Sequence, residues 1–263
     1  MVIRILLFVL ALVLAPISTV LAQSSPDLKK LDEISDEALQ MVKVKRYDES
    51  EKLLEYFSTQ FLSMTVEAKF FSMDELRIIT VAHNEALVTV QDETISYEKK
   101  VNAVTKLRLV TDAVYSNHQP LWTEMEGQIM STFNQTKIAM KNKDSDGFHS
   151  YINRLLNQYD LIYPSLKVDL APEKIQKLDA RMSFIDQYRP QVFSDTTSQK
   201  ELDALEKDLE SIFDEMTEDE TDPSLWWVII STGSIIILTL SYVGWRKYKG
   251  DKEEKKSDKE LNH

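Results

Sequence analysis

The sequence predicts an all-α protein: stacked antiparallel helical hairpins, about eight helices in a bundle or short solenoid, followed by one C-terminal transmembrane helix. Only two glycines occur between residues 23 and 224, whereas a sheet protein of this length would use many in tight turns. Apolar residues in the same range recur at every third or fourth position, which is the period of an amphipathic helix. Residues 225–245 contain no charged side chain and are long enough to cross a bilayer.

The N-terminal segment, residues 1–22, has the pattern of a secretory signal peptide. Arg4 precedes an apolar run, and Val20 and Ala22 fit the −3 and −1 positions of a cleavage site. We therefore expect cleavage before Gln23. An uncleaved signal anchor is the alternative, because residues 3–17 are long enough to remain in a membrane as a second helix.

The extracytoplasmic helical domain is predicted over residues 23–224. Ser25 is the expected N-cap of its first helix and Pro26 the first helical residue. Pro172 is expected to open the seventh helix and Pro190 to close it. The eight apolar stripes are Leu28 to Met41, Tyr47 to Phe61, Leu76 to Val90, Val101 to Tyr115, Leu121 to Phe133, Phe148 to Tyr159, Ile175 to Ile185 and Leu202 to Met216.

Short polar breaks between these stripes predict antiparallel neighbours, in four pairs. A weak internal repeat supports the pairing: Tyr47, Tyr97 and Phe148 are 50 and 51 residues apart, and each opens the second helix of a pair. Residues 163–171 form the longest interior break, which could separate a C-terminal hairpin from the rest.

The transmembrane helix is predicted over residues 225–245. Aromatic rings mark both ends, Trp226 and Trp227 at one and Tyr242 and Trp245 at the other, as they do at membrane interfaces. Basic residues follow directly, so the positive-inside rule places the C-terminus in the cytoplasm and the helical domain outside. The alternative, a buried core helix, would leave the aromatic ends unexplained.

Two polar segments flank this helix. Residues 214–222 carry six carboxylates in nine positions, which indicates a solvated stalk. The more specific alternative is a low-affinity calcium site. Residues 246–263 form a lysine-rich cytoplasmic tail that we expect to be disordered. With 18 residues, the tail is too short for a kinase or cyclase domain.

Charge and cysteine content restrict the partners. The outer domain has 38 acidic and 23 basic side chains, a formal net charge of −15, which argues against nucleic acid and anionic headgroups as partners. The chain contains no cysteine, so it forms no disulfide and carries no lipoprotein anchor. The expected partners are a protein of the cell envelope and the bilayer around residues 225–245.

A search for an active site yields no catalytic, cofactor-binding or metal-binding residues, and we expect no cofactor. Phosphate-binding glycine loops and the nucleophile elbow are missing. The four histidines, His83, His118, His149 and His263, are too scattered to indicate zinc, and His83 is expected to be structural. Carboxylate pairs are numerous by chance alone. A group of methionine and aromatic residues could line a ligand groove but is expected in the core: Trp122, Met125, Met130, Phe133, Met140, Tyr151 and Tyr159.

The whole layout resembles the sporulation protein YpjB family of Bacillus and its relatives. The resemblance covers the signal segment, the helical domain, the anchor bounded by Trp226 and Trp227, the lysine-rich tail, and segments such as RYDESEKLLEYF. It implies a role in endospore formation and synthesis in the mother cell under the early sporulation sigma factor. It brings no functional residues with it.

The first functional hypothesis is therefore a membrane-anchored, non-enzymatic interaction protein of the cell envelope that supports endospore formation. Its predicted location is the mother-cell membrane, crossed once, with the helical domain outside. Two alternatives remain open: an envelope sensor that binds a small ligand within the helical domain, and a cell-wall hydrolase that uses two carboxylates.

Overall fold

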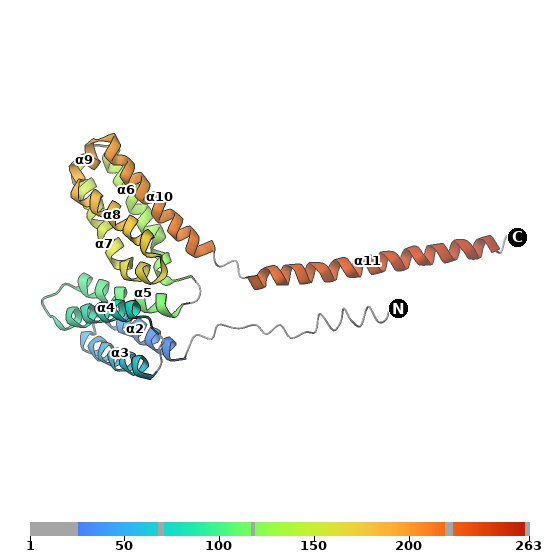
Figure 1. Cartoon of the computed structure of the whole chain (residues 1–263), viewed down its shortest axis with the longest axis horizontal. Coiled ribbons are helices and arrows are strands. Elements are labelled where there is room, and N and C mark those ends of the chain that lie inside the picture. Colours follow the sequence, from blue (N-terminus) through green and yellow to red (C-terminus); the bar gives the residue numbers. More distant parts are fainter. Residues whose placement is uncertain (1–25, 68–70, 117–118, 219–222, 261–263) are drawn as a thin grey trace. The chain divides into compact units, whose positions relative to one another are not determined.

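The structure is a computed structural model that describes residues 26–67, 71–116, 119–218 and 223–260. All regular structure in these residues is helical, which confirms the predicted all-α class. The predicted signal peptide lies outside them. The helices, shown in Figure 1, are α2 (Pro26–Lys43), α3 (Tyr47–Glu67), α4 (Met73–Gln91), α5 (Tyr97–Tyr115), the 3-10 helix η1 (Leu121–Met125), α6 (Glu126–Lys141), α7 (Ser145–Asp169), α8 (Pro172–Gln187), α9 (Arg189–Ser194), α10 (Thr196–Glu218) and α11 (Pro223–Glu260).

The first four helices close into a bundle. α2 packs against both α3 and α5, α3 packs against α4, and α4 packs against α5, so these contacts form a ring. An open solenoid would leave its first and fourth helices apart. The contact between α2 and α5 therefore favours the bundle of the two predicted arrangements for this part of the chain.

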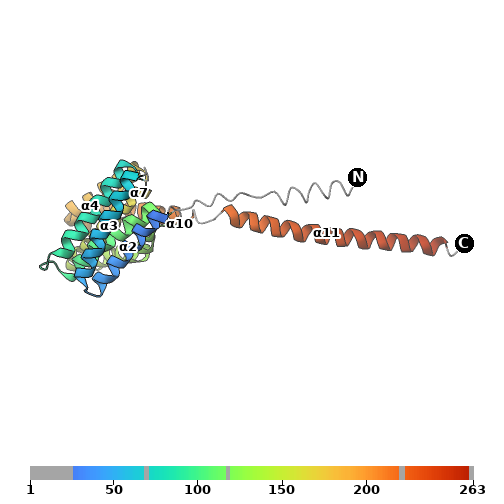
Figure 2. The same ribbon diagram turned by 90° about the horizontal axis from the view of Figure 1, so that it is seen from below.

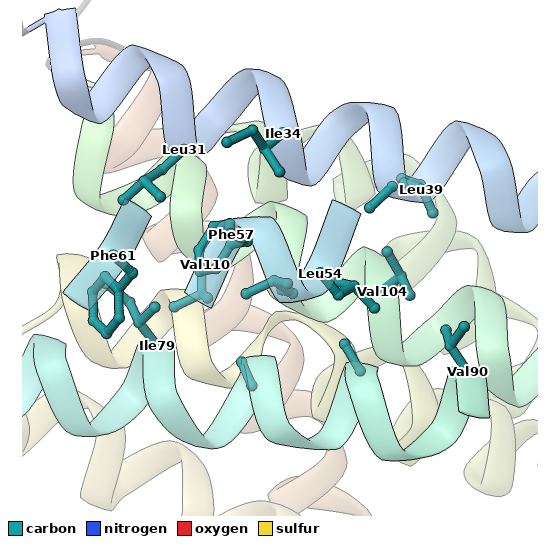
Figure 3. Packing of buried hydrophobic residues seen from close by; sticks show 14 of the residues in the cluster. Leu31, Ile34, Leu39, Leu54, Phe57, Phe61, Ile79, Val90, Val104 and Val110 are labelled. Carbon is teal, nitrogen blue, oxygen red and sulfur yellow. The ribbon is translucent and has the colours of Figure 1, made fainter. Parts of the chain in front are cut away.

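The interior of this bundle is filled by the apolar stripes of its four helices. Leu31, Phe57, Ile79 and Val110, one from each helix, are at most 1% exposed and point into the shared core (Figure 3). Each comes from a stripe with helical spacing, which places its apolar side chains on one face. Burying such side chains stabilises the fold by roughly 1.5–3 kcal/mol apiece before conformational entropy is subtracted.

Helix α5 connects this bundle to the following helices. It contacts α2 and α4 within the bundle and α7 outside it, and it buries ten of its residues. A surface helix shows one buried stripe, whereas α5 is covered on several sides. Polar residues such as Lys106 and Asp112 are among those buried.

The second half of the domain begins with the hairpin of α6 and α7, and α7 in turn contacts α8 and α9. Ion pairs attach α10 to its neighbours. Lys137 of α6 binds Asp203 at 3.1 Å, and Lys177 of α8 binds Asp208 at 2.7 Å. Buried leucines of α10, among them Leu205, supply the apolar part of this packing.

The predicted interior break over residues 163–171 is wrong, because α7 continues to Asp169. Pro164 lacks an N–H and normally ends or kinks a helix by removing one backbone hydrogen bond. Here Ile162 and Leu166 are fully buried on either side of it, and the Tyr163 hydroxyl donates to Asp179 of α8 at 2.8 Å. Tertiary packing therefore holds this segment helical, and the break shrinks to two residues before α8.

Two further differences concern helix ends. The predicted fifth helix starts as η1 and only then becomes α6, because the Thr123 N–H and hydroxyl both bond the carbonyl of Pro120 in a tight turn. Pro190 was expected to close the seventh helix, but it lies in the first turn of the short helix α9, after α8 has ended at Gln187. Proline is compatible with a first turn, where its missing N–H has no helical acceptor.

The C-terminal unit contains α11, a single uninterrupted helix (Figures 1 and 2). Residues Ile229–Gly250 of it are long and apolar enough to cross a membrane, and their side chains are exposed in the structure. The placement of the Trp226 and Trp227 rings, and residues 219–222 of the predicted stalk, lie outside the described parts.

The tail was predicted to be disordered, but residues 246–260 continue α11. The physical reason lies in composition: lysine and glutamate have high helix propensity, and the preceding apolar helix removes the cost of nucleation. Disorder was predicted from net charge and polarity, and these two properties depend neither on helix propensity nor on the cost of helix nucleation.

Candidate functional site

The side chains that line the candidate site lie mainly on α4, α5 and α7. A capping box fixes the start of α4: the Glu75 N–H donates to the Ser72 hydroxyl at 3.2 Å, and the Ser72 N–H donates to the Glu75 carboxylate at 2.6 Å. The buried Lys100 ammonium closes the other end by donating to the carbonyls of Thr89, Val90 and Asp92 at 2.6–2.9 Å. These caps hold α4 rigidly beside α5.

Two adjoining hollows lie between α4, α5 and α7. The first has a volume of about 280 Å³ and the second about 390 Å³, and Glu85, Lys106 and Asp160 line both, so the two form one groove. The first hollow is also lined by Arg77, Ile78, Val81, Ala82, Tyr163, Pro164 and Lys167. The second is also lined by Thr89, Ile95, Ser96, Glu98, Lys99, Asn102, Ala103, Asn157 and Leu161.

Lys106 lies where the two hollows adjoin and forms salt bridges to both flanking helices. Its ammonium lies 2.9 Å from a carboxylate oxygen of Glu85 on α4 and 2.8 Å from one of Asp160 on α7. Burial alone would lower the pKa of Lys106, but hydrogen bonds to Asp160 and Glu85 and their negative charges raise it above its ordinary value. The lysine stays charged and ties the first bundle to α7.

The first hollow combines an apolar wall with basic groups. Its apolar lining consists of Ile78, Val81 and Ala82 of α4 and of Tyr163 and Pro164 of α7. The basic groups are Arg77 on α4 and Lys167 on α7, and the Lys167 ammonium lies 5.1 Å from the centre of the Tyr163 ring. Such a hollow suits a ligand or side chain with an apolar body and a carboxylate.

The outer face of α4 beside the groove is unusually apolar. Met73, Val81 and Val88 are 81%, 61% and 64% exposed. Val81 and Val88 are seven positions apart and lie on nearly the same side of the helix, whereas Met73, eight positions before Val81, lies about 80° around the axis. We call these three residues the exposed stripe of α4. Single exposed apolar residues are common, but a stripe beside a groove marks a candidate contact surface.

A second, partly buried polar cluster surrounds Arg108 of α5 and involves α2 and η1. The guanidinium forms ion pairs with Asp32 and Asp36 of α2 and lies 3.8 Å from Asp112. Asp112 accepts the N–H of Leu121 at 2.6 Å. Burial raises the pKa of Asp32 and of Asp112, and the positive charge of Arg108 offsets this only in part.

Asp169, at the end of α7, completes this polar region. It accepts a 2.6 Å hydrogen bond from the indole N–H of Trp122, whose fully buried ring lies 5.5 Å from that of Phe213. Burial raises the pKa of Asp169 to about 6, the hydrogen bond from Trp122 acts against it, and the charge of Asp112 adds to it. These carboxylates pair with groups of the fold, and neither hollow is lined by them.

The predicted structural role of His83 agrees with its surroundings. The side chain is 6% exposed, stacks on Phe57, and its Nε2 bonds the carbonyl of Leu54 at 2.8 Å. Among the described residues, no group of three or more His, Asp or Glu side chains is arranged to hold a metal ion. His118 and His263 lie outside those residues.

The structure places three of the aromatic groove candidates in the core. Trp122 and Phe133 are fully buried, and Tyr159 is 8% exposed with its hydroxyl donating to Asp179 at 2.7 Å. Burial and the charge of Asp179 raise the pKa of Tyr159 well above its ordinary value. The expected core role therefore holds for these three residues.

Sequence reasoning missed the groove. Its residues come from three helices and are up to 90 positions apart, at 77–89, 95–106 and 157–167. One signal in the sequence pointed towards it: Val81 and Val88 fall off the apolar stripe of α4. The burial of Lys106 has no such signal, because it depends on the contact of α5 with α4 and α7.

Comparisons with known proteins agree with the predicted resemblance. The family model described as "Sporulation protein YpjB (SpoYpjB)" matches residues 28–257. A relative from Bacillus subtilis (strain 168), described as "Uncharacterized protein YpjB", is 35% identical over 231 residues, which cover 87% of this chain and 88% of that protein. No solved structure matches the chain significantly. The match spans the helical domain and most of α11, and the chain belongs to the sporulation protein YpjB family.

Proposed function

We propose that this chain is a non-enzymatic, membrane-anchored interaction protein that supports endospore formation by binding a protein of the cell envelope. Membership of a sporulation family supports the process. The single observation that carries the binding role is the groove between α4 and α7, with the exposed apolar stripe of α4 beside it.

The anchoring part of the proposal rests on α11. Its residues Ile229–Gly250 have the length and composition of a membrane span, and basic residues begin at Arg246. A positive excess on one side of a span favours the cytoplasm for that side. The helical domain then lies outside, and the groove faces the extracytoplasmic space of the mother-cell membrane.

Support for a non-enzymatic role comes from the titratable groups that catalysis would require. His83 bonds a backbone carbonyl, Asp169 bonds Trp122, and the carboxylates of Glu85 and Asp160 both bond Lys106. A general acid or base has to exchange its proton with a substrate. These groups are instead engaged with the fold, and the salt bridge in the groove suits recognition better than proton transfer.

The proposal is tested by Val81→Lys, a change at the groove that leaves the core untouched because Val81 is 61% exposed. Leu62→Lys on α3, at 60% exposure, is the matched control outside the groove. We expect Val81→Lys to reduce the count of heat-resistant spores to that of a deletion strain, while Leu62→Lys sporulates normally. If the Val81→Lys strain sporulates normally at an equal protein level, the groove is not the binding site.

A further inference from the structure

We propose that the groove takes an amphipathic helix of the partner protein, with apolar side chains against α4 and carboxylates against Arg77 and Lys167. This inference rests on the proposed function and adds the chemistry of the partner segment. Three features of the groove carry it: its length, its apolar wall and its local charge.

The length and apolar pattern fit a helix. Along α4 the two hollows are lined from Arg77 to Thr89, about 18 Å at 1.5 Å per residue, which is about three helical turns. Ile78 and Ala82 lie deeper at 8% and 1% exposure, with Val81 above them at the edge. An amphipathic helix laid along a groove presents apolar side chains at this same three- and four-residue spacing.

The charge beside the groove determines which charge we expect on the partner segment. The outer domain as a whole has a formal net charge of −15 and repels acidic segments. Beside the first hollow, however, Arg77 and Lys167 bring two cations together on facing helices. The charge of Lys106 is already matched by Glu85 and Asp160. Arg77 also forms a salt bridge, to Asp74 of its own helix at 3.2 Å, but both side chains are mostly exposed, and such a surface pair is weak enough for Arg77 to exchange it for a carboxylate of the partner. Lys167 and Arg77 therefore supply the attraction.

The distribution of charge along the groove also predicts the orientation of the bound helix. Glu85, Lys106 and Asp160 line both hollows, so the difference lies in the remaining charges. Arg77 and Lys167 add two cations to the first hollow, whereas Glu98 and Lys99 add one charge of each sign to the second. Carboxylates of the partner should therefore gather at the end marked by Arg77. A helix carries partial positive charge at its N-terminus and favours acidic residues there, so this end would receive the N-terminal turns of the partner helix.

Site-specific photo-crosslinking in sporulating cells tests the inference on the full chain. The crosslinking residue p-benzoylphenylalanine replaces Val81 in one strain and Leu62, the matched exposed position on α3, in the other. We expect the first strain to yield a crosslinked peptide with apolar residues three and four apart and Asp or Glu within one turn of them. The second strain should yield none of this peptide.

Charge reversal supplies the second arm. Arg77→Glu with Lys167→Glu should reduce the crosslink about tenfold, because attraction at the rim becomes repulsion. Lys52→Glu with Lys200→Glu changes the net charge equally at exposed positions outside the groove and should leave the crosslink intact. Replacing the carboxylates of the captured segment by lysine should restore crosslinking to the reversed variant.

The outcomes separate the inference from the proposed function. A crosslinked segment without acidic residues, or a crosslink unchanged by reversal at Arg77 and Lys167, overturns the helix and charge assignment but leaves a protein-binding groove. A crosslink from Val81 to lipid, to a small molecule or to a second copy of this chain also overturns it. No crosslink at Val81, together with normal sporulation of Val81→Lys, overturns both.

Discussion

Asp169 brings a carboxylate into the interior, where its hydrogen-bond donor is the indole of Trp122 rather than a cation. Its pKa of about 6 lies above the ordinary value of 3.8, so the folded state binds the proton more tightly than the unfolded state does. The energetic cost of ionising Asp169 is therefore present above pH 6. This cost is relieved as the pH falls through 6 towards 4.

We expect Asp169→Asn to stabilise the domain at pH 7.5 by about 2 kcal/mol, since two pKa units correspond to roughly 2.7 kcal/mol and a neutral hydrogen bond to Trp122 is weaker. At pH 5 the gain should fall to less than about half of this value, because the folded carboxyl is then mostly protonated while the unfolded one is still mostly ionised, and it should disappear near pH 4. Thermal unfolding of the full chain in detergent, followed by helical circular dichroism, measures both values. Glu93→Gln, in an exposed loop, should show no such difference, and an equal gain at both pH values would contradict the assignment.

Among the helices, α5 contributes most to the integrity of the domain because it belongs to the first bundle and also contacts α7. Leu107 lies at its centre and is fully buried. Truncating it leaves a cavity that the surrounding helices cannot fill without moving.

Leu107→Ala should therefore destabilise the domain by about 3 kcal/mol and lower Tm by roughly 6–12 °C in the same thermal experiment. Leu62→Ala, on the exposed side of α3, should change Tm by no more than about 2 °C. Equal effects of the two substitutions would show that α5 does not have the central packing role described above.

The orientation of α11 can be tested directly because the chain contains no cysteine. Ser63→Cys places a single thiol on the exposed side of α3, and Ser257→Cys places one beyond the basic end of the span. If the positive end is cytoplasmic, a membrane-impermeant maleimide should label Ser63→Cys in intact protoplasts and Ser257→Cys only after lysis. The reverse pattern would invert the topology, and labelling of both would argue against a span.

For the whole chain, the helices could be predicted from the sequence because each carries its own apolar stripe. Tyr47 and Tyr97 begin α3 and α5 as expected, since both follow short polar breaks. The errors occurred at prolines. Pro164 continues a helix and Pro190 starts one, and a proline allows either outcome until tertiary packing decides.

Two features could not be predicted in the same way: the closure of the first bundle, and the presence of the groove. Both depend on which helix faces pack against one another. No local pattern indicates that Lys106 would reach Glu85 and Asp160, which are 21 and 54 residues away. The same holds for Arg108 with Asp32. Such pairs form between helices whose order in space the sequence leaves open.

The extent of α11 bears on the two remaining roles, binding and sensing. Binding at the membrane surface requires only that α11 hold the domain in place, whereas a sensor must pass a signal to the residues beyond the span. Truncation after Lys249 retains the span up to its last basic anchor, with Arg246 and Lys247, and removes residues 250–263.

For a surface interaction protein, we expect this truncation to leave the count of heat-resistant spores unchanged within about twofold, since the three basic residues still fix the orientation of the helix. Replacing residues 225–245 with an unrelated apolar span of equal length should be tolerated as well, because anchoring depends on length and apolarity rather than on the identity of each side chain. Immunoblots of the membrane fraction control for expression. A truncated chain that stays in the membrane but fails to support sporulation would favour the sensor, because the residues beyond the span would then be needed for more than anchoring.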